Sequence, residues 1–411
     1  MHKGKIILSA LLAIGFLLFS YWITNLRIPL SGEETVLTNF ELVRGYFQLK
    51  ENTMSDSVLM VNICYDKQEV IATDEYGFPT GKTYITDRNK LLTFLQYLKE
   101  KDDYKYIILD VFFGEGATTE VDSLLFTTIH SMPRIVIPCH SDEKLIDEKL
   151  YDKAGIADYT TTYQESSFIK FPYLPDSLKS LPMKMYEELT GKSIDRKGIF
   201  YTEGNKLVRS SIVLTFDFIC NGAYNNEGEK TWYNLGMDLL GDSIDENTKG
   251  DSLLFKVPEL TTGKYIVVGA YENEDIHEIY LGEQPGVCIN FNAYLALLQK
   301  HHHICTSLYF VLFFTFFIFS YLILSRESLA DIINKPKSIK NPLLLRLQHV
   351  LLFLCSWIGF SLFLTILCII TYLWLGEVYD IFITASLFGI LNTIVKLITK
   401  YKDRLCIVTE K

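Results

Sequence analysis

The chain has 411 residues, a formal net charge of −10 and 49% hydrophobic residues, which are concentrated at the N-terminus and in the last quarter. The apolar segments and their flanks carry about +6, so the region between them, residues 27–303, carries about −16. Such a charge disfavours nucleic acid or an acidic lipid surface as a partner of that region, and it permits cations or basic ligands.

Four charge-free stretches are candidates for crossing a lipid bilayer. A helix rises about 1.5 Å per residue, so a hydrocarbon core of roughly 30 Å needs about 20 apolar residues. The stretches are residues 6–26, 304–325, 350–376 and 381–395. The last spans only about 22 Å as a helix. It crosses if Asp380 lies at one interface and Lys396 snorkels to the other; otherwise it is a re-entrant or surface helix.

The positive charges that flank these stretches predict their orientation. Lys and Arg are concentrated in residues 3–5, 326–346 and 396–404, whereas residues 377–380 hold only acidic charges. If the chain crosses four times, the positive-inside rule places both termini in the cytoplasm and residues 27–303 outside. The first stretch, residues 1–26 with its basic start, is expected to stay as an anchor because Phe19-Ser20-Tyr21-Trp22 is too bulky for signal-peptide cleavage.

The outer region alternates predicted strands and helices in chain order, which indicates an α/β fold with a mainly parallel sheet flanked by helices. Its strands are continuous apolar runs, as expected for strands buried on both faces. A hairpin is expected at residues 199–209 around Gly204-Asn205, and residues 221–251 resemble a surface insertion around one helix. The predicted strands are residues 58–64, 106–111, 134–139 and 264–270. One helix is predicted to start at Asp87, and the other predicted helices are residues 121–130, 143–149, 182–190 and 286–300.

No cofactor or metal site is expected from the motifs. The eight cysteines are spread singly, without a Cys-x-x-Cys pair. Gly81-Lys82-Thr83 resembles the end of a phosphate-binding loop, but the required first glycine is Tyr76. His301-His302-His303 offers ligands for a transition metal, although polar residues are also common at the mouth of a membrane helix. No catalytic triad can be assembled, so we do not expect an enzyme.

Candidate ligand-binding residues follow from the geometry of parallel sheets. Ligands of open α/β sheets bind beyond the carboxyl ends of the strands. The residues in the sequence that follow or end the predicted strands in this way are Asp66, Asp110, Gly269, Tyr271 and Asp275. For Asp110, the cap of a loop or of the next helix is the alternative role.

Five motifs in order resemble the type-2 CHASE domain, an extracellular sensory domain associated with cyclases and histidine kinases. They are Thr86-Asp87-Arg88-Asn89-Lys90-Leu91-Leu92, Ile108-Leu109-Asp110-Val111-Phe112-Phe113, Lys170-Phe171-Pro172, Gly263-Lys264-Tyr265-Ile266-Val267-Val268-Gly269-Ala270 and Pro285-Gly286-Val287-Cys288-Ile289-Asn290-Phe291. The resemblance covers about residues 36 to 300 and extends to the arrangement of one membrane helix before the domain and three after it.

This sequence departs from the family at three points. The His-Ala of the last motif is Asn290-Phe291, and the end of the first strand, usually Ile-Asp-Asp, reads Ile63-Cys64-Tyr65-Asp66. The third departure is that only a basic tail, residues 397–411, follows the three-helix region at residues 304–396, so no cytoplasmic output domain is expected.

The sequence therefore predicts a bacterial inner-membrane sensory protein embedded in the lipid bilayer. A homodimer is one oligomeric state that we consider for it. Its output would come from a separate signalling or scaffold protein that contacts the basic inner loop, residues 326–346. We expect the coupling to run through a rigid helix that continues from Gly286 into the second membrane segment. A non-signalling scaffold of an envelope complex is the alternative function.

Overall fold

The computed structural model describes residues 2–25, 38–39, 42–43, 46, 57–74, 76–158, 170–174, 179–220, 222–224, 228–241, 253–279, 281–325, 357–375, 385–395 and 397–398. The chain forms two compact units. One unit comprises residues 27–302 and is called the outer domain below. The other comprises residues 1–26 and 303–411 and is called the helical unit.

The outer domain is built on a six-stranded sheet in which every pair of neighbouring strands is parallel. The strand order is β12-β1-β13-β4-β5-β6. Strand β13, the last of the six in the sequence, therefore lies between β1 and β4. The strands are β1 (Val58–Asn62), β4 (Tyr106–Leu109), β5 (Ile135–Cys139), β6 (Ala154–Ile156), β12 (Tyr233–Asn234) and β13 (Tyr265–Gly269).

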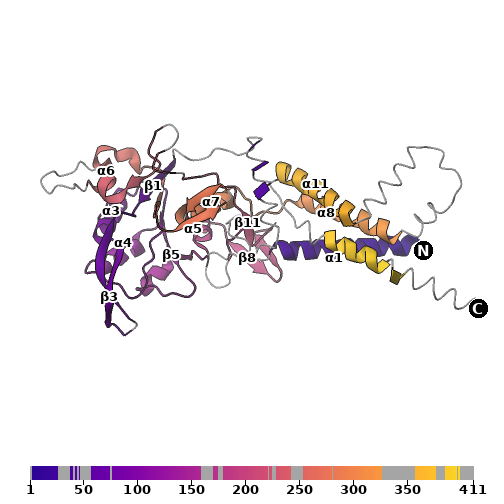
Figure 1. Cartoon of the computed structure of the whole chain (residues 1–411), viewed down its shortest axis with the longest axis horizontal. Helices are drawn as coiled ribbons and strands as arrows, with labels where there is room; N and C mark the ends of the chain where they lie inside the picture. The colour runs from indigo at the N-terminus through magenta and orange to yellow at the C-terminus, as the bar shows by residue number, and fades with distance from the viewer. Residues whose placement is uncertain are drawn as a thin grey trace, which may run out of the picture. The chain divides into compact units, whose positions relative to one another are not determined.

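Helices cover both faces of this sheet, as Figure 1 shows for α3 and α4 on one side of β1 and α5 and α7 on the other. Alternate residues of each strand belong to different cores, because side chains alternate across a strand. Thus Ile107 packs with α3 and α4, whereas Ile108 packs with α5 and α7. The four helices are α3 (Arg88–Lys101), α4 (Asp122–Ser131), α5 (Leu181–Thr190) and α7 (Gly286–Leu298).

The mainly parallel α/β sheet and most of its elements confirm the sequence prediction. Asp87 caps α3, since its carboxylate accepts hydrogen bonds from the N–H groups of Asn89 and Lys90. The hairpin of β9 (Phe200–Glu203) and β10 (Lys206–Val208) turns at Gly204, whose φ is 59°. A third strand, β8 (Ile194–Lys197), extends that hairpin.

One prediction of secondary structure is wrong and another is right only in part. The acidic helix at residues 143–149 is absent, and a short 3-10 helix, η2 (Glu148–Asp152), begins at its end. The stretch predicted as a surface insertion around one helix does contain a helix, the π-helix η3 (Leu235–Leu240), but Tyr233 and Asn234 also form the edge strand β12 of the main sheet. Leu235 and Leu239 bury their side chains in the core, which explains why this stretch joins the domain.

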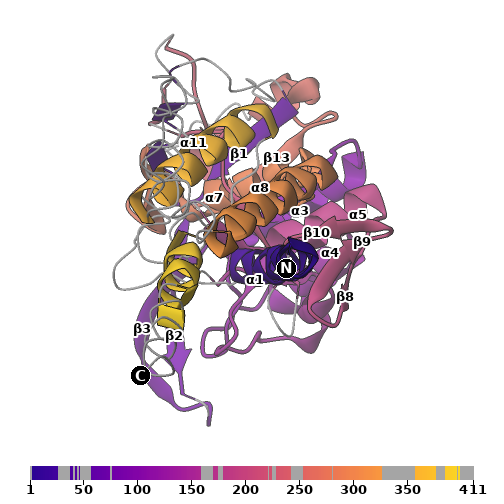
Figure 2. The same cartoon turned by 90° about the vertical axis from the view of Figure 1, so that its right-hand side faces the viewer.

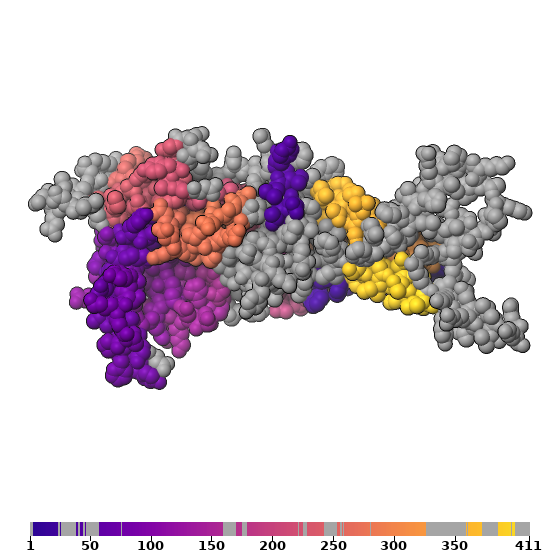
Figure 3. Space-filling model, viewed as in Figure 1, coloured from indigo at the N-terminus to yellow at the C-terminus, as the bar shows by residue number. Residues whose placement is uncertain are grey.

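The remaining elements form small sheets and single turns. An antiparallel hairpin of β2 (Lys67–Thr73) and β3 (Pro79–Thr86) stands out from the surface of the domain (Figure 3). The other small elements are β7 (Lys170–Pro172), β11 (Ser211–Val213), β14 (Ile276–Ile279), β15 (Gly282–Pro285), α6 (Leu253–Lys256) and η4 (Pro258–Leu260).

The helical unit contains α1 (His2–Thr24), α8 (Thr306–Leu324) and α11 (Trp357–Leu375). Two described helices, at Lys3–Ile23 and Thr306–Leu324, are long and apolar enough to cross a membrane. Figure 2 shows α1 and α8 side by side, and their Phe16 and Phe316 rings make an edge contact. The apolar helical stretch Ala385–Val395 contributes Phe388, whose ring packs against both phenylalanines.

The helix that was expected to run from Gly286 into the second membrane segment is not continuous. Helix α7 ends at Leu298, and α8 begins at Thr306. Lys300 has a φ of 67°, a left-handed conformation that cannot continue a right-handed helix. Rigid coupling through one uninterrupted helix is therefore wrong, and residues 299–305 form a turn between two separate helices.

Candidate functional site

A cavity of about 930 Å³ lies beyond the carboxyl ends of the central strands. This volume is in the range of small-molecule sites, and the position is the one expected for a ligand of an open parallel sheet. Each of five strands supplies lining residues at or just after its end, among them Ile63 after β1, Asp110 after β4, Pro138 and His140 around the end of β5, Asp158 after β6 and Ala270 after β13.

Asp110 and Asp275 bring two carboxylates into this cavity from neighbouring strand ends. The backbone N–H of Asp110 donates to the carbonyl oxygen of Val268 at 2.8 Å, which continues the ladder between β4 and β13 past Leu109. Asp275 lies in the turn after β13, where Asn273 and Asp275 have φ values of 61° and 50°. This turn, which needs left-handed backbone at two non-glycine residues, returns the chain to the sheet edge.

Asp275 also contacts the first residue of α7. The backbone N–H of Gly286 donates to the carbonyl oxygen of Asp275 at 2.8 Å. A Cβ atom at Gly286 would lie 2.2 Å from Oδ2 of Asp275, so only glycine allows the carboxylate this close to the helix. The negative charge therefore lies at the positive end of the α7 dipole, where it is stabilised.

The pKa of Asp110 is raised from its ordinary value. Burial, followed by the negative charge of Asp275, raises this pKa from 3.8 to about 7. Near neutral pH the side chain therefore exchanges between a neutral acid and a carboxylate, and a positive charge brought into the cavity would favour the carboxylate.

Asn290 lines the cavity from α7. It lies four residues after Gly286, one helical turn further along the same face of the helix. The side chain is only 1% exposed, and its Oδ1 accepts no hydrogen bond from any residue that the structure describes. An amide oxygen buried in this way is costly unless a ligand or water donates to it. Asp110, Asp275 and Asn290 are called the acceptor cluster below.

A second polar group lines the cavity where β5 and β6 end. Asp158 accepts from the backbone N–H of Ser141 at 2.8 Å and from the Ser141 hydroxyl, and its other oxygen lies 2.7 Å from Nδ1 of His140. Partial burial raises the pKa of Asp158, but the hydrogen bonds from Ser141 and His140 lower it by more, so the pKa is below its ordinary value. Because the serine hydroxyl donates to the aspartate and not to the histidine, the histidine is not placed to activate it as a nucleophile.

The lysine and the arginine that line the cavity are both held by acids, and so is the lining histidine His277, whose Nε2 lies 2.9 Å from Oδ1 of Asp275. Nζ of Lys67 lies 2.6 Å from Oε2 of Glu274. The Arg88 guanidinium pairs with Asp122 in the interior between α3 and α4, where only 4% of the Arg88 side chain is exposed. These positive charges are therefore already compensated by protein carboxylates.

The structure places two of the five predicted site residues in the cavity, Asp110 and Asp275. Asp66 contacts Nζ of Lys90 at 2.8 Å and accepts from the Gly236 N–H at 3.0 Å, so it ties α3 to η3. Gly269 lies under α7, because a Cβ there would be 2.9 Å from Val287. Tyr271 is buried, stacks on Trp232 and donates its hydroxyl to the Val267 carbonyl at 2.9 Å.

Sequence reasoning missed Asn290, His140, Ser141 and Asp158 as lining residues. His140 and Ser141 directly follow a predicted strand, so the rule that selected Asp110 also applies to them. Asp158 follows β6, a three-residue strand too short to be recognised in the sequence. Asn290 lies inside a helix, and nothing in the sequence shows that this face of the helix turns toward the strand ends.

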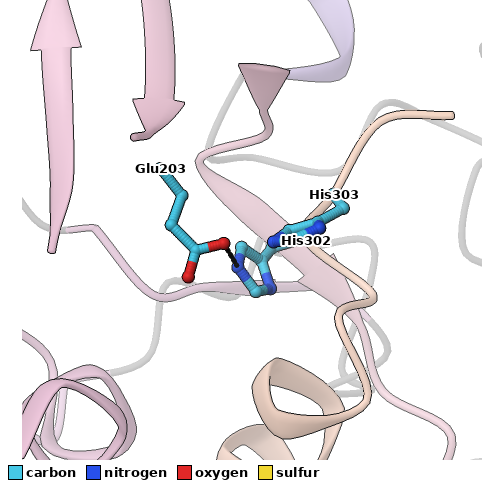
Figure 4. Close-up of side chains that lie close together, drawn as sticks. All are labelled: Glu203, His302 and His303. Carbon is cyan, nitrogen blue, oxygen red and sulfur yellow. Dashed lines mark ion pairs between the residues drawn. The ribbon is translucent and has the colours of Figure 1, made fainter. Parts of the chain in front are cut away.

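Among the described residues, one group combines ligand types that bind a transition metal. Glu203, His302 and His303 have ligand atoms within 4.8 Å of one another, and Figure 4 shows the ion pair of the first two. Nε2 of His302 lies 3.7 Å from Oε2 of Glu203, and the Tyr186 hydroxyl donates to Oε1 of Glu203 at 2.7 Å. The same contacts hold His302, the last residue of the outer domain, against β9.

Comparisons with protein-family models, with curated proteins and with solved structures found no match to this chain. The class that the structure itself defines is an α/β domain with a cavity at the carboxyl edge of a parallel sheet, in a chain with two helices able to cross a membrane.

Proposed function

We propose that this chain is a membrane sensory protein of the type-2 CHASE kind, whose outer domain binds a small ligand in the cavity at the sheet edge. The observation that carries the proposal is the position of that cavity against the start of α7. Helix α7 contributes Asn290 to the cavity and contacts Asp275 through Gly286, and the same helix is the last one of the outer domain before α8.

Helix α7 is suited to transmit a displacement because it is buried along its length. Every residue from Gly286 to Leu297 is buried. A closely packed helix moves as a body, since its neighbours leave no space for local deformation. A ligand that changes the contacts of Gly286 or Asn290 would therefore shift α7 against the sheet and not bend it.

The end of α7 is fixed to the outer domain by its following turn. The N–H of Arg209 donates to the carbonyl oxygen of His302 at 2.9 Å, and the buried imidazole pairs with Glu203. A shift of α7 would thus reach β9 and β10 together with the residues that lead to α8. This arrangement replaces the uninterrupted helix that the sequence predicts.

In the membrane, the proposal is a four-crossing protein with residues 27–302 outside the cytoplasm. The two apolar helices α1 and α8, the helix α11 and the stretch Ala385–Val395 supply the crossings. The packing of Phe388 on Phe16 and Phe316 supports a place for the fourth stretch within the helical unit. The output is proposed to pass to a separate protein that contacts residues 326–346.

Copurification after crosslinking in membranes tests this function. We expect a kinase, a cyclase or another signalling protein to crosslink to the basic loop. Recovery of an assembly or secretion complex that is insensitive to substitutions in the acceptor cluster would instead support the scaffold function and contradict sensing.

A further inference from the structure

We propose that the acceptor cluster binds the ammonium group of a small organic amine. This inference names the ligand class of the cavity and so rests on the proposed function. An ammonium group has three N–H donors and one positive charge. Asp110, Asp275 and Asn290 offer two carboxylates and an amide oxygen that has no donor among the described residues.

The charge of the whole lining favours a cation over an anion. Five lining residues are acidic, whereas the lysine and arginine residues of the lining are Lys67 and Arg88, and two more lining residues are the histidines His140 and His277. The lysine and the arginine are held in ion pairs, with Glu274 and Asp122. An anion would therefore have to displace a protein carboxylate, and it would meet the carboxylates of the acceptor cluster, although Nε2 of His277 lies 2.9 Å from Oδ1 of Asp275. The dipole of α7 does not change this balance, because Asp275 already occupies its positive end.

The geometry favours an ammonium ion over a divalent metal ion. A calcium ion takes six to eight oxygen ligands, usually with several carboxylates in direct contact. In the described part of the chain, the one group of three acidic, histidine or cysteine ligands within 4.8 Å of one another is at Glu203. His277 contacts Asp275 at 2.9 Å, but it does not form such a group with Asp110 and Asp275. Two acids and one amide are few for calcium, but they match the three donors of a primary ammonium group.

The cavity also has room and charge for more than the ammonium group. Its volume of about 930 Å³ exceeds that of a methylamine-sized ligand many times, and Asp142 also lines it. A second positive group on the same ligand would meet this acid. The geometry thus points to an aliphatic diamine or polyamine before a monoamine.

Calorimetric titration of the full-length protein in detergent tests the inference. The probes are 1,4-diaminobutane and butylamine, with tetramethylammonium as a cation without N–H donors, glutarate as an anion without an amine and calcium chloride as the metal. We expect the diamine to bind more tightly than butylamine, and tetramethylammonium to bind at least about tenfold more weakly than butylamine, because it makes no hydrogen bonds to the cluster.

The variants Asp110→Asn, Asp275→Asn and Asn290→Leu should each weaken diamine binding by about tenfold or more. The control Asp195→Asn removes the same charge from the exposed side of β8 and should leave binding unchanged. A melting curve for each variant shows whether it is folded. Asp110→Asn keeps the shape of the side chain and removes a buried charge, so it is expected to fold.

The result that overturns the inference is the absence of diamine binding to the folded wild-type protein, or binding that all three variants retain. Binding of calcium or glutarate that is lost in Asp110→Asn would also overturn the assignment of an amine ligand, while leaving the cavity as the ligand site. Failure of the sensory function has a different signature, namely diamine binding that depends on the cluster but does not alter the crosslinks of the basic loop.

Discussion

The side chain of Asp110 shows how this domain sets the charge of its cavity through burial. The groups that face it are Asp275, which is acidic, and the buried Tyr271 and Cys288, whose pKa values burial raises so that they stay neutral. In the unfolded chain the carboxyl has its ordinary pKa of 3.8, and in the folded protein the value is about 7. The folded state therefore holds a proton between these pH values that the unfolded state has lost.

This linkage predicts a pH-dependent gain in stability for Asp110→Asn. The contribution of protonated Asp110 to the free energy of unfolding is fully present below about pH 4. It is lost as the pH rises through 7, because the buried carboxyl then ionises beside Asp275. An asparagine has no such charge. We expect the variant to melt at a higher temperature than the wild type at pH 8, with a gap that narrows toward pH 5. A pH-independent gap would show that burial does not raise this pKa.

Gly286 is a second single residue on which the site depends. The substitution Gly286→Ala places a Cβ where Oδ2 of Asp275 lies, so the carboxylate must move away from α7. We expect loss of diamine binding and a lower melting temperature. The double variant Gly286→Ala with Asp275→Gly removes the clash and should recover the melting temperature without recovering binding. Unchanged binding in the single variant would contradict the placement of Asp275.

At the scale of elements, the ion pair of Arg88 and Asp122 joins α3 to α4 in the interior. The Asp122 carboxylate also accepts from the Thr119 hydroxyl at 2.6 Å and the Thr119 N–H at 2.9 Å. Removing one partner leaves the other charge buried and uncompensated. We expect Asp122→Ala to lower the free energy of unfolding by about 3–5 kcal/mol, as measured by denaturant titration.

The double variant Arg88→Met with Asp122→Leu is the control for that prediction. It replaces both charges by apolar side chains, which commonly restores most of the stability that a broken buried pair loses. A double variant as unstable as Asp122→Ala would show that packing, and not the unpaired arginine, causes the loss.

The elements that the sequence predicts well are those with a strong local pattern. The apolar runs of β1, β4, β5 and β13 and the leucine stripe of α3 are each explained by burial. The hairpin β2–β3 has no such pattern, because its strands are mostly polar and every residue in them is half-buried or exposed. The position of β13 between β1 and β4 is set by pairing across more than 150 residues, and no short window of the sequence contains that information.

The same reasoning explains which part of the site was predictable. Asp110 and Asp275 follow strands, and the rule for parallel sheets selects them directly. Asn290 was outside that rule because it belongs to a helix, and its importance follows from the contact of Gly286 with Asp275 one turn earlier. Asp66 and Tyr271 meet the rule equally well, but their side chains turn toward η3 and the interior.

At the scale of the whole molecule, the proposed topology makes a prediction about the C-terminus. An epitope tag added after Lys411 should resist protease in intact spheroplasts, because the proposed topology places the basic residues 396–404 on the cytoplasmic side. A tag inserted in the exposed turn of the β2–β3 hairpin is the matched control and should be digested. Digestion of both tags would contradict the fourth crossing.

The claim that the cavity controls an output is tested most directly by photo-crosslinking from Lys337, in the basic loop, in living cells. The measurement compares the wild type with Asp110→Asn and Asp275→Asn, and with Asp195→Asn as the control on the outer surface of β8. A sensor predicts that the two cavity variants change the yield or identity of the crosslinked partner, whereas the control matches the wild type. Identical crosslinks in all four proteins, with the cavity variants folded and unable to bind diamine, would contradict a sensory role.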